Sequence, residues 1–218
     1  MTACGSNHRL VPSHTSWWHP FDRYRTQHVV ARGDTLYAIA FRYDQDYRQL
    51  AIKNSIYPPY KLHVGQVVLL KANAPVKKPV YIRSRSGAHK RTIQPVRLAA
   101  WTWPLKGRVQ ARFIPSKGQK GIDISGSKAQ KIYAASGGIV AYSGMGLPGY
   151  GNLIIINHPN HYLTAYGNNS RNLVHEGQSV KEGQIIGVIG IVDNRYWGLH
   201  FEVRKSGRPV NPLSFLSR

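Results

Sequence analysis

The chain of 218 residues, 42% of them hydrophobic, is long enough for one or two domains with folded cores. No stretch approaches the run of about eighteen apolar residues that a membrane-spanning helix requires. With 30 Lys and Arg against 9 Asp and Glu, the net charge of +21 attracts polyanions. These include anionic lipid head groups, acidic cell-wall polymers and nucleic acid. We expect no nucleic-acid partner, because no recognised binding motif accompanies the charge.

Residues 1–26 lack apolar periodicity and are expected to form a flexible tether. They contain the single cysteine, Cys4, so no intrachain disulfide can form. The segment around Cys4 resembles the end of a bacterial lipoprotein signal, where the cysteine is acylated after cleavage. That resemblance implies a lipid anchor in the outer membrane. The basic and apolar regions of such a signal are absent upstream, so either the recorded start falls late or Cys4 is an incidental thiol.

Residues 27–71 show the order strand, helix, helix, strand. The strands are expected at Gln27–Val30 and Gly65–Leu70, with two short helices between them. Asp34 and Asp46 are suited to cap these helices, and the second helix should end at Asn54. The expected apolar face of the first helix consists of Leu36, Ile39, Ala40 and Tyr43.

This segment resembles a LysM domain, a resemblance carried by Gly33-Asp34-Thr35-Leu36, Ile39-Ala40, Asn54 and Gly65-Gln66. It implies a β-α-α-β module that binds the N-acetylglucosamine-containing glycan of peptidoglycan, in a groove between two loops. Ile56 and Tyr57 could form the apolar floor of that groove, although Pro58-Pro59-Tyr60 departs from the family pattern. The expected peptidoglycan-binding residues are Gly33, Asp34, Thr35, Leu36, Asn54, Ile56 and Tyr57. Gly33 and Asp34 also suit a turn followed by a helix cap.

Residues 72–100 are expected to be a linker. They contain seven Lys and Arg, no acidic residue and three prolines, Pro75, Pro79 and Pro95. Such a segment should be extended and self-repelling, and it would keep the chain close to anionic polymers.

Residues 101–218 show short strands separated by glycine turns, with no convincing amphipathic helix. Strands are expected at 108–113, 121–124, 138–142, 153–157, 163–166, 185–189 and 200–203. This pattern favours a mainly antiparallel all-β domain. The whole chain is therefore predicted to be α+β, with a small β-α-α-β module before the all-β domain.

The second half resembles the LytM or lysostaphin-type zinc metallopeptidases, which cut peptide bridges in bacterial cell walls. The matching motifs are Trp103-Pro104, Gly107-Arg108-Val109, Gly121-Ile122-Asp123-Ile124, Tyr150-Gly151-Asn152, Tyr162-Leu163-Thr164-Ala165-Tyr166, Val180-Lys181-Glu182-Gly183-Gln184, Leu199-His200-Phe201-Glu202 and Asn211-Pro212. In that family, an H-x-x-x-D element and the second histidine of H-x-H hold zinc. The first histidine of H-x-H and a Y-x-H histidine assist the attacking water.

Carried over residue by residue, the resemblance leaves the catalytic site incomplete. Asp123 and His200 keep two ligand positions, but the third position is Gln119, and the helper positions are Asn168 and Gly198. A catalytic zinc needs three protein ligands, and a missing general base costs about 10²–10⁴ in rate. We therefore expect no catalytic residue, no metal and no other cofactor.

A LysM domain, a linker and a degenerate LytM domain resemble the NlpD group of murein hydrolase activators, with Gly149–Ile156 and Asn211–Leu213 especially similar. The resemblance implies a periplasmic activator of an N-acetylmuramoyl-L-alanine amidase in cell division, anchored to the outer membrane as a lipoprotein. The former active-site cleft could hold the amidase, since Tyr, Trp and Arg anchor interfaces. The residues expected there are Gln119, Asp123, Tyr150, Asn168, Arg195, Tyr196, Trp197 and His200.

Two alternatives remain open on the sequence alone. The protein could be a zinc endopeptidase with an unusual ligand set, although Gln119, Asn168 and Gly198 disfavour it. It could also be a structural tether that binds peptidoglycan and activates nothing. Asp123 and His200 could then simply pair with each other, and Tyr196-Trp197 could be a packed turn.

Overall fold

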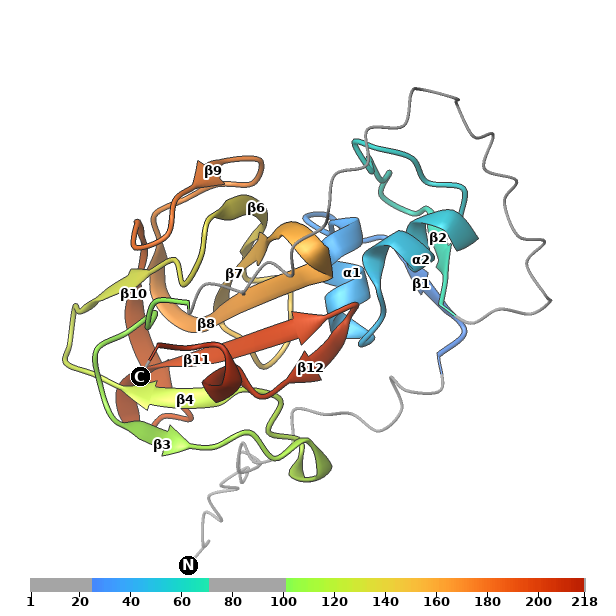
Figure 1. Ribbon diagram of the computed structural model, residues 1–218. Helices are drawn as coiled ribbons and strands as arrows, with labels where there is room; N and C mark the ends of the chain where they lie inside the picture. Colours follow the sequence, from blue (N-terminus) through green and yellow to red (C-terminus); the bar gives the residue numbers. More distant parts are fainter. Residues whose placement is uncertain (1–24, 71–100, 218) are drawn as a thin grey trace, which may run out of the picture.

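The computed structural model describes residues 25–70 and 101–217, which form two parts packed side by side (Figure 1). Residues 25–70 are called the LysM module below, and residues 101–217 the β-domain. The expected linker, residues 72–100, and the expected tether with Cys4, residues 1–26, lie outside the described residues, except for residues 25 and 26. No helix of the described ranges is long and apolar enough to cross a membrane.

The LysM module has the predicted β-α-α-β order. It consists of β1 (Gln27–Val29), α1 (Leu36–Arg42), α2 (Tyr47–Lys53) and β2 (Val67–Leu69), and the two strands pair antiparallel. Asp46 caps α2 through the amide of Arg48, as expected.

The cap of α1 differs from the expectation. Thr35 is the N-cap, because its extended backbone lets the hydroxyl accept a hydrogen bond from the Ala38 amide at 3.1 Å. Asp34 instead accepts from the Ala31 amide at 2.8 Å and pairs with His28 at 2.7 Å. It therefore closes the turn before the helix.

Helix α1 buries two faces rather than the single predicted one. Leu36, Ile39 and Ala40 pack in the core of the LysM module. Ala38 and Phe41 point the other way and pack against the β-domain, with Phe41 only 1% exposed. The LysM module is thus joined to the β-domain through α1 (Figure 1).

The β-domain is one antiparallel sheet, which confirms the predicted fold class. Along the sheet the strand order is β3-β4-β11-β10-β8-β7-β6-β9, with β12 beside β11 and β5 beside β10. Its strands are β3 (Val109–Ala111), β4 (Ile122–Ser125), β5 (Lys131–Tyr133), β6 (Gly138–Gly144), β7 (Asn152–Asn157), β8 (Tyr162–Asn172), β9 (Ser179–Val180), β10 (Ile185–Val192), β11 (Tyr196–Lys205) and β12 (Arg208–Val210). Two single-turn 3₁₀ helices, η2 (Pro115–Lys117) and η3 (Pro159–His161), lie between the strands, and a third, η4 (Pro212–Ser214), follows β12.

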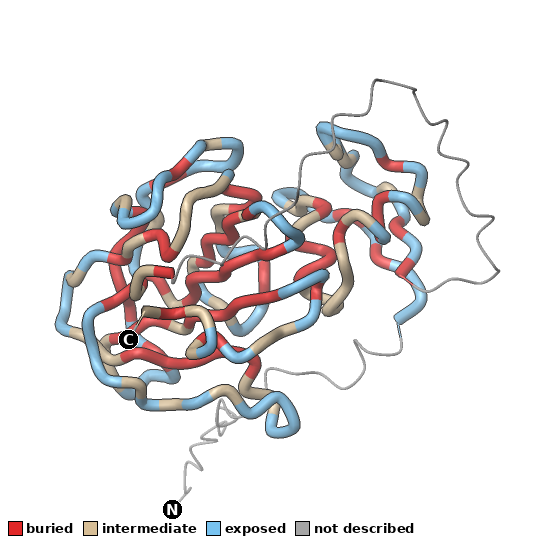
Figure 2. The backbone as a smooth tube through the Cα atoms, viewed as in Figure 1, coloured by how far each residue is buried: buried red, intermediate tan, exposed pale blue. Residues whose placement is uncertain are grey.

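Seven of these strands overlap the predicted ones, and the short β5, β9 and β12 were not predicted. They have only two or three residues each, too few for an alternating pattern to stand out. The long central strands are buried along most of their length (Figure 2).

The central strands separate two apolar clusters, because successive side chains point to opposite faces. Leu199, Phe201 and Val203 of β11 belong to the main core, together with Ile154 and Ile156 of β7. The opposite face, called the outer face below, carries Ile155 of β7 and the polar residues of β11, and α1 covers part of it.

A buried polar chain ties the main core together. The Tyr166 hydroxyl accepts a hydrogen bond from the Ala135 amide at 2.9 Å and one from the Thr164 hydroxyl at 3.0 Å. His158 bonds to Thr164 and to the Gly137 carbonyl, both at 2.7 Å. His158 is only 4% exposed, so its imidazole is part of the buried interior.

Replacement Tyr166→Phe should lower the free energy of unfolding by about 1–3 kcal/mol, because the Ala135 amide loses its buried acceptor. Denaturant unfolding followed by fluorescence measures this. Tyr133→Phe, at a half-buried position of β5, is the control. Equal losses in the two variants would contradict a structural role for the Tyr166 hydroxyl.

Candidate functional site

The candidate site lies on the outer face, where β4, β11 and β8 run side by side. His200 of β11 is opposite Asp123 of β4 and opposite Gly167 of β8. This register places the two retained ligand positions next to each other, with the Y-x-H segment beside them. Tyr150, which precedes β7, adds a ring whose centroid is 5.8 Å from that of His200.

The imidazole of His200 is held between two carboxylates. Its Nδ1 lies 2.6 Å from Oδ1 of Asp123, and its Nε2 lies 3.1 Å from Oε1 of Glu202. Both carboxylates are buried, with side-chain exposures of 6% and 1%. The imidazole can donate from both nitrogens at once only when it is protonated, so this arrangement favours the imidazolium.

Electrostatics agree with that assignment. Burial alone lowers the pKa of His200, but hydrogen bonds to Asp123 and Glu202, together with their charges, outweigh burial and raise it to about 10. Burial also opposes ionisation of Glu202, yet Arg204 and His200 hold the pKa of its carboxyl well below the usual range. The site is therefore a chain of alternating charges.

These donors do not fit a catalytic zinc. A zinc-binding histidine must offer a free lone pair, whereas both nitrogens of His200 face carboxylate oxygens. Glu202 has no oxygen to spare, since it accepts from the Tyr150 hydroxyl at 2.7 Å and from Nε of Arg204 at 2.8 Å. At the third position, Gln119 offers a neutral amide, and its Nε2 is buried with no hydrogen-bond partner.

At Gly198, the expected helper position, the surroundings leave no room for a side chain. A Cβ on Gly198 would lie 2.6 Å from the Ile124 carbonyl oxygen and 3.0 Å from the ring of Tyr196. Because the first contact is with the backbone of the paired strand, a larger side chain would push β4 and β11 apart. The other helper position, Asn168, is half-buried with a φ of 61°. Its backbone N–H donates a hydrogen bond to the Tyr150 carbonyl at 2.7 Å.

The structure brings together only some of the residues expected in the partner-binding cleft. Asp123 is 5% exposed and the His200 side chain 14%, so they are a largely buried floor. Gln119, Tyr150, Asn168 and Tyr196 are half-buried, and Arg195 is exposed in the turn before β11.

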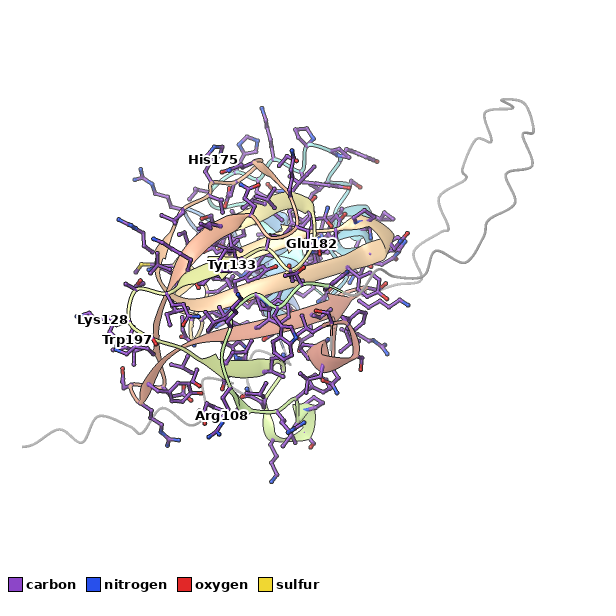
Figure 3. All side chains as sticks on the ribbon, turned by 60° about the vertical axis from the view of Figure 1, so that its left-hand side comes forward. Arg108, Lys128, Tyr133, His175, Glu182 and Trp197 are labelled. Carbon is purple, nitrogen blue, oxygen red and sulfur yellow. The ribbon has the colours of Figure 1, made fainter. Side chains whose placement is uncertain are left out.

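Trp197 does not line this face. It follows Tyr196 on the same strand, so its side chain points to the opposite side and packs against the main core. Lys128 lies over its ring at 5.9 Å, and both residues are at the edge of the domain (Figure 3). Trp197 therefore supports the fold rather than the predicted cleft.

Sequence reasoning missed the joint between this site and the LysM module. Arg204, 1% exposed, donates from Nη1 to Oδ1 of Asp44 and to the Phe41 carbonyl, both at 2.7 Å. Lys120 forms a second ion pair with Asp44. The available signal was the strict alternation His200-Phe201-Glu202-Val203-Arg204, which puts three charged groups on one face of a buried strand.

The residues expected to bind glycan are divided between two grooves. Asn54, Ile56 and Tyr57 line a groove of about 410 Å³, together with Ser55, Pro59, Lys61, His63 and Gln66. Gly33, Asp34 and Thr35 instead line a groove of about 740 Å³ that they share with Tyr142–Gly146 and Val174–Glu176 of the β-domain. Leu36 is fully buried and lines neither groove.

Within the first groove, the residues have different roles. Asn54 clamps the end of α2 to β2, since its side chain bonds to the Leu69 amide at 2.7 Å and to the Leu50 carbonyl at 2.8 Å. Ile56 is 8% exposed and belongs to the core, while Tyr57 is 75% exposed. Tyr57 is thus the aromatic surface that this groove offers a ligand.

Comparisons with known proteins agree with this architecture. The family model of the LysM domain matches residues 28–71, and that of peptidase family M23 matches residues 117–212. A Pseudomonas aeruginosa protein named lipoprotein NlpD/LppB homolog is 40% identical over 88% of this chain and 77% of its own length. The Escherichia coli lipoprotein YgeR is 39% identical over 87% of this chain and 80% of its own length. The Escherichia coli murein hydrolase activator NlpD is 35% identical over 87% of this chain and 67% of its own length.

Replacement Gly198→His should not rebuild a metal site and should cost about 1–3 kcal/mol of stability, because the new side chain collides with Ile124 and Tyr196. Chemical denaturation and zinc content by mass spectrometry test both parts. Ile191→His, at an exposed position of β10, measures the cost of a histidine without a collision. Stoichiometric zinc in Gly198→His would contradict the prediction.

The raised pKa of His200 predicts how stability depends on pH. Its value of about 10 lies above the ordinary 6.5, so this group's contribution is fully present below about pH 6.5. The contribution is lost as the pH rises through 10. Unfolding free energies of the protein and of His200→Gln should therefore converge as the pH approaches 10. NMR of the ring supplies the direct measurement, and an imidazole that titrates near 6.5 would contradict it.

Proposed function

Because this chain belongs to the NlpD family of lipoproteins and murein hydrolase activators, we propose that it activates a peptidoglycan hydrolase without cleaving bonds itself. The hydrolase proposed is an N-acetylmuramoyl-L-alanine amidase acting in cell division and daughter-cell separation. The LysM module localises the activator on peptidoglycan, and the β-domain acts on the amidase.

One observation carries the non-catalytic part of the proposal: His200 lies between Asp123 and Glu202. An imidazolium held by two carboxylates neither binds a metal nor accepts a proton from water. The closure of the sheet around Gly198 supports the same conclusion, because it removes the space of a second histidine.

The proposed contact surface for the amidase is the half-buried and exposed part of the outer face. It consists of Gln119, Asn168, Arg195 and Tyr196, with Tyr150, Asp123 and His200 beneath them as support. An exposed arginine next to a half-buried tyrosine is a typical interface anchor. Binding there would shift the amidase toward its active state by differential affinity for that state.

The proposed location is the periplasm, with Cys4 acylated in the outer membrane. The lipoprotein names of the relatives support this part. The net charge of +21 favours a position close to the acidic cell-wall polymers. Within the LysM module, Tyr57 and its groove are the proposed glycan contact.

Release of dye from labelled peptidoglycan tests the activator function. The protein and an N-acetylmuramoyl-L-alanine amidase from the same organism are assayed separately and together. Release should be high only in the mixture. Arg195→Ala should raise the concentration needed for half-maximal activation by roughly tenfold, as expected when an interface arginine is truncated.

Lys181→Ala is the matched control, since it removes one exposed positive charge from the turn that follows β9. The other outcomes separate the rival functions. Release by the protein alone would show an endopeptidase, and a mixture no better than the amidase would leave a wall-binding tether. Equal effects of Arg195→Ala and Lys181→Ala would remove Arg195 as an anchor.

A further inference from the structure

The second apolar face of α1 has no function inside the LysM module. Ala38 and Phe41 are 3% and 1% exposed, yet neither belongs to the core cluster of the module. They pack with residues of the outer face of the β-domain, namely Ala141, Tyr142, Leu147, Leu153, Ile155, Leu163 and Ala165. Without the β-domain, the module would expose a phenylalanine ring to water.

Charged groups fix the position of α1 on this face. The guanidinium of Arg204 lies 3.5 Å from the centroid of the Phe41 ring and pairs with Asp44 at 2.7 Å. Lys120, 8% exposed, pairs with the same carboxylate. One acidic residue of the LysM module thus satisfies two buried cations of the β-domain.

Two chains of contacts lead from this joint to the candidate site. Phe41 packs edge-on against Tyr150, with ring centroids 5.4 Å apart, and Tyr150 packs in the same way against His200 at 5.8 Å. In parallel, Arg204 pairs with Glu202, and Glu202 with His200. Helix α1 therefore lies on the same continuous surface as the residues proposed to support the partner contact.

We propose that the LysM module occupies in cis part of the surface through which the β-domain engages its partner, and that the partner must displace α1 to bind fully. This inference rests on the proposed activator function. The contacts of Phe41 and Asp44 indicate which partner segment would fit this surface. It would place an aromatic side chain over Arg204 and, three residues later, a carboxylate between Arg204 and Lys120. The docked module is thus an autoinhibitory contact.

Gly207 offers a way to undock the module without touching the site. A Cβ on Gly207 would lie 2.2 Å from the backbone carbon of Gln45, so Gly207→Ala should push the LysM module away. Because Gly207 has a φ of +80°, an alanine there also strains the backbone. Gly183→Ala is the control for that strain, since Gly183 has a φ of +72° and its Cβ would meet nothing within 4 Å. Asp44→Lys, which repels Arg204 and Lys120, is the second undocking variant, with Gln49→Lys on the exposed side of α2 as its control.

The experiment combines two measurements on the full chain. Small-angle X-ray scattering reports the radius of gyration, and dye release with the amidase reports activation. The undocking variants should show a larger radius of gyration than their controls. Their half-maximal activating concentration should be about tenfold lower, within the range of ordinary coupling between sites.

Each other outcome overturns a specific part. Undocking variants with a larger radius of gyration but unchanged activation would show that the LysM module masks nothing. Weaker activation would show that the module belongs to the activating surface. Unchanged radii in both undocking variants would overturn the docked arrangement. Absence of activation by the wild-type chain and by every variant would overturn the proposed function and, with it, the masking.

Discussion

The buried guanidinium of Arg204 is the charge on which both the site and the domain interface depend. It is 1% exposed and pairs with Glu202 on its own strand and with Asp44 on the LysM module. Removing one partner of the fully buried Arg204–Glu202 pair costs about 3–5 kcal/mol, because the remaining charge stays desolvated, whereas the side chain of Asp44 is 34% exposed. Glu202 in turn fixes His200. The geometry of the candidate site and the position of the module are therefore energetically linked.

This network holds the side chains of the candidate site in place. In a zinc site, the cation holds the negatively charged ligands together. Here a protonated imidazole takes that position between Asp123 and Glu202, and Arg204 balances the second carboxylate. A cation made of a side chain activates no water, which supports the proposed non-catalytic function.

The sequence was sufficient for the fold class and for most of the elements, because long strands with alternating residues and capped helices carry strong local signals. It failed where the deciding contact is far away along the chain. Phe41 looks like one more apolar residue of a short helix, and only Arg204 and Tyr150 show why it is buried. Trp197 was misplaced even though a local rule of strand geometry applies to it. Neighbouring residues of a strand face opposite ways, so it cannot share a surface with Tyr196.

A small module attached through a linker needs only to fill its own core. Helix α1 places this one under a different constraint, since it must fill the module's own core on one side and match the β-domain on the other. A LysM domain grafted from another protein would meet the first requirement and fail the second. A chimera that carries a foreign LysM domain on this β-domain should therefore keep Ala38, Phe41 and Asp44 at the corresponding positions.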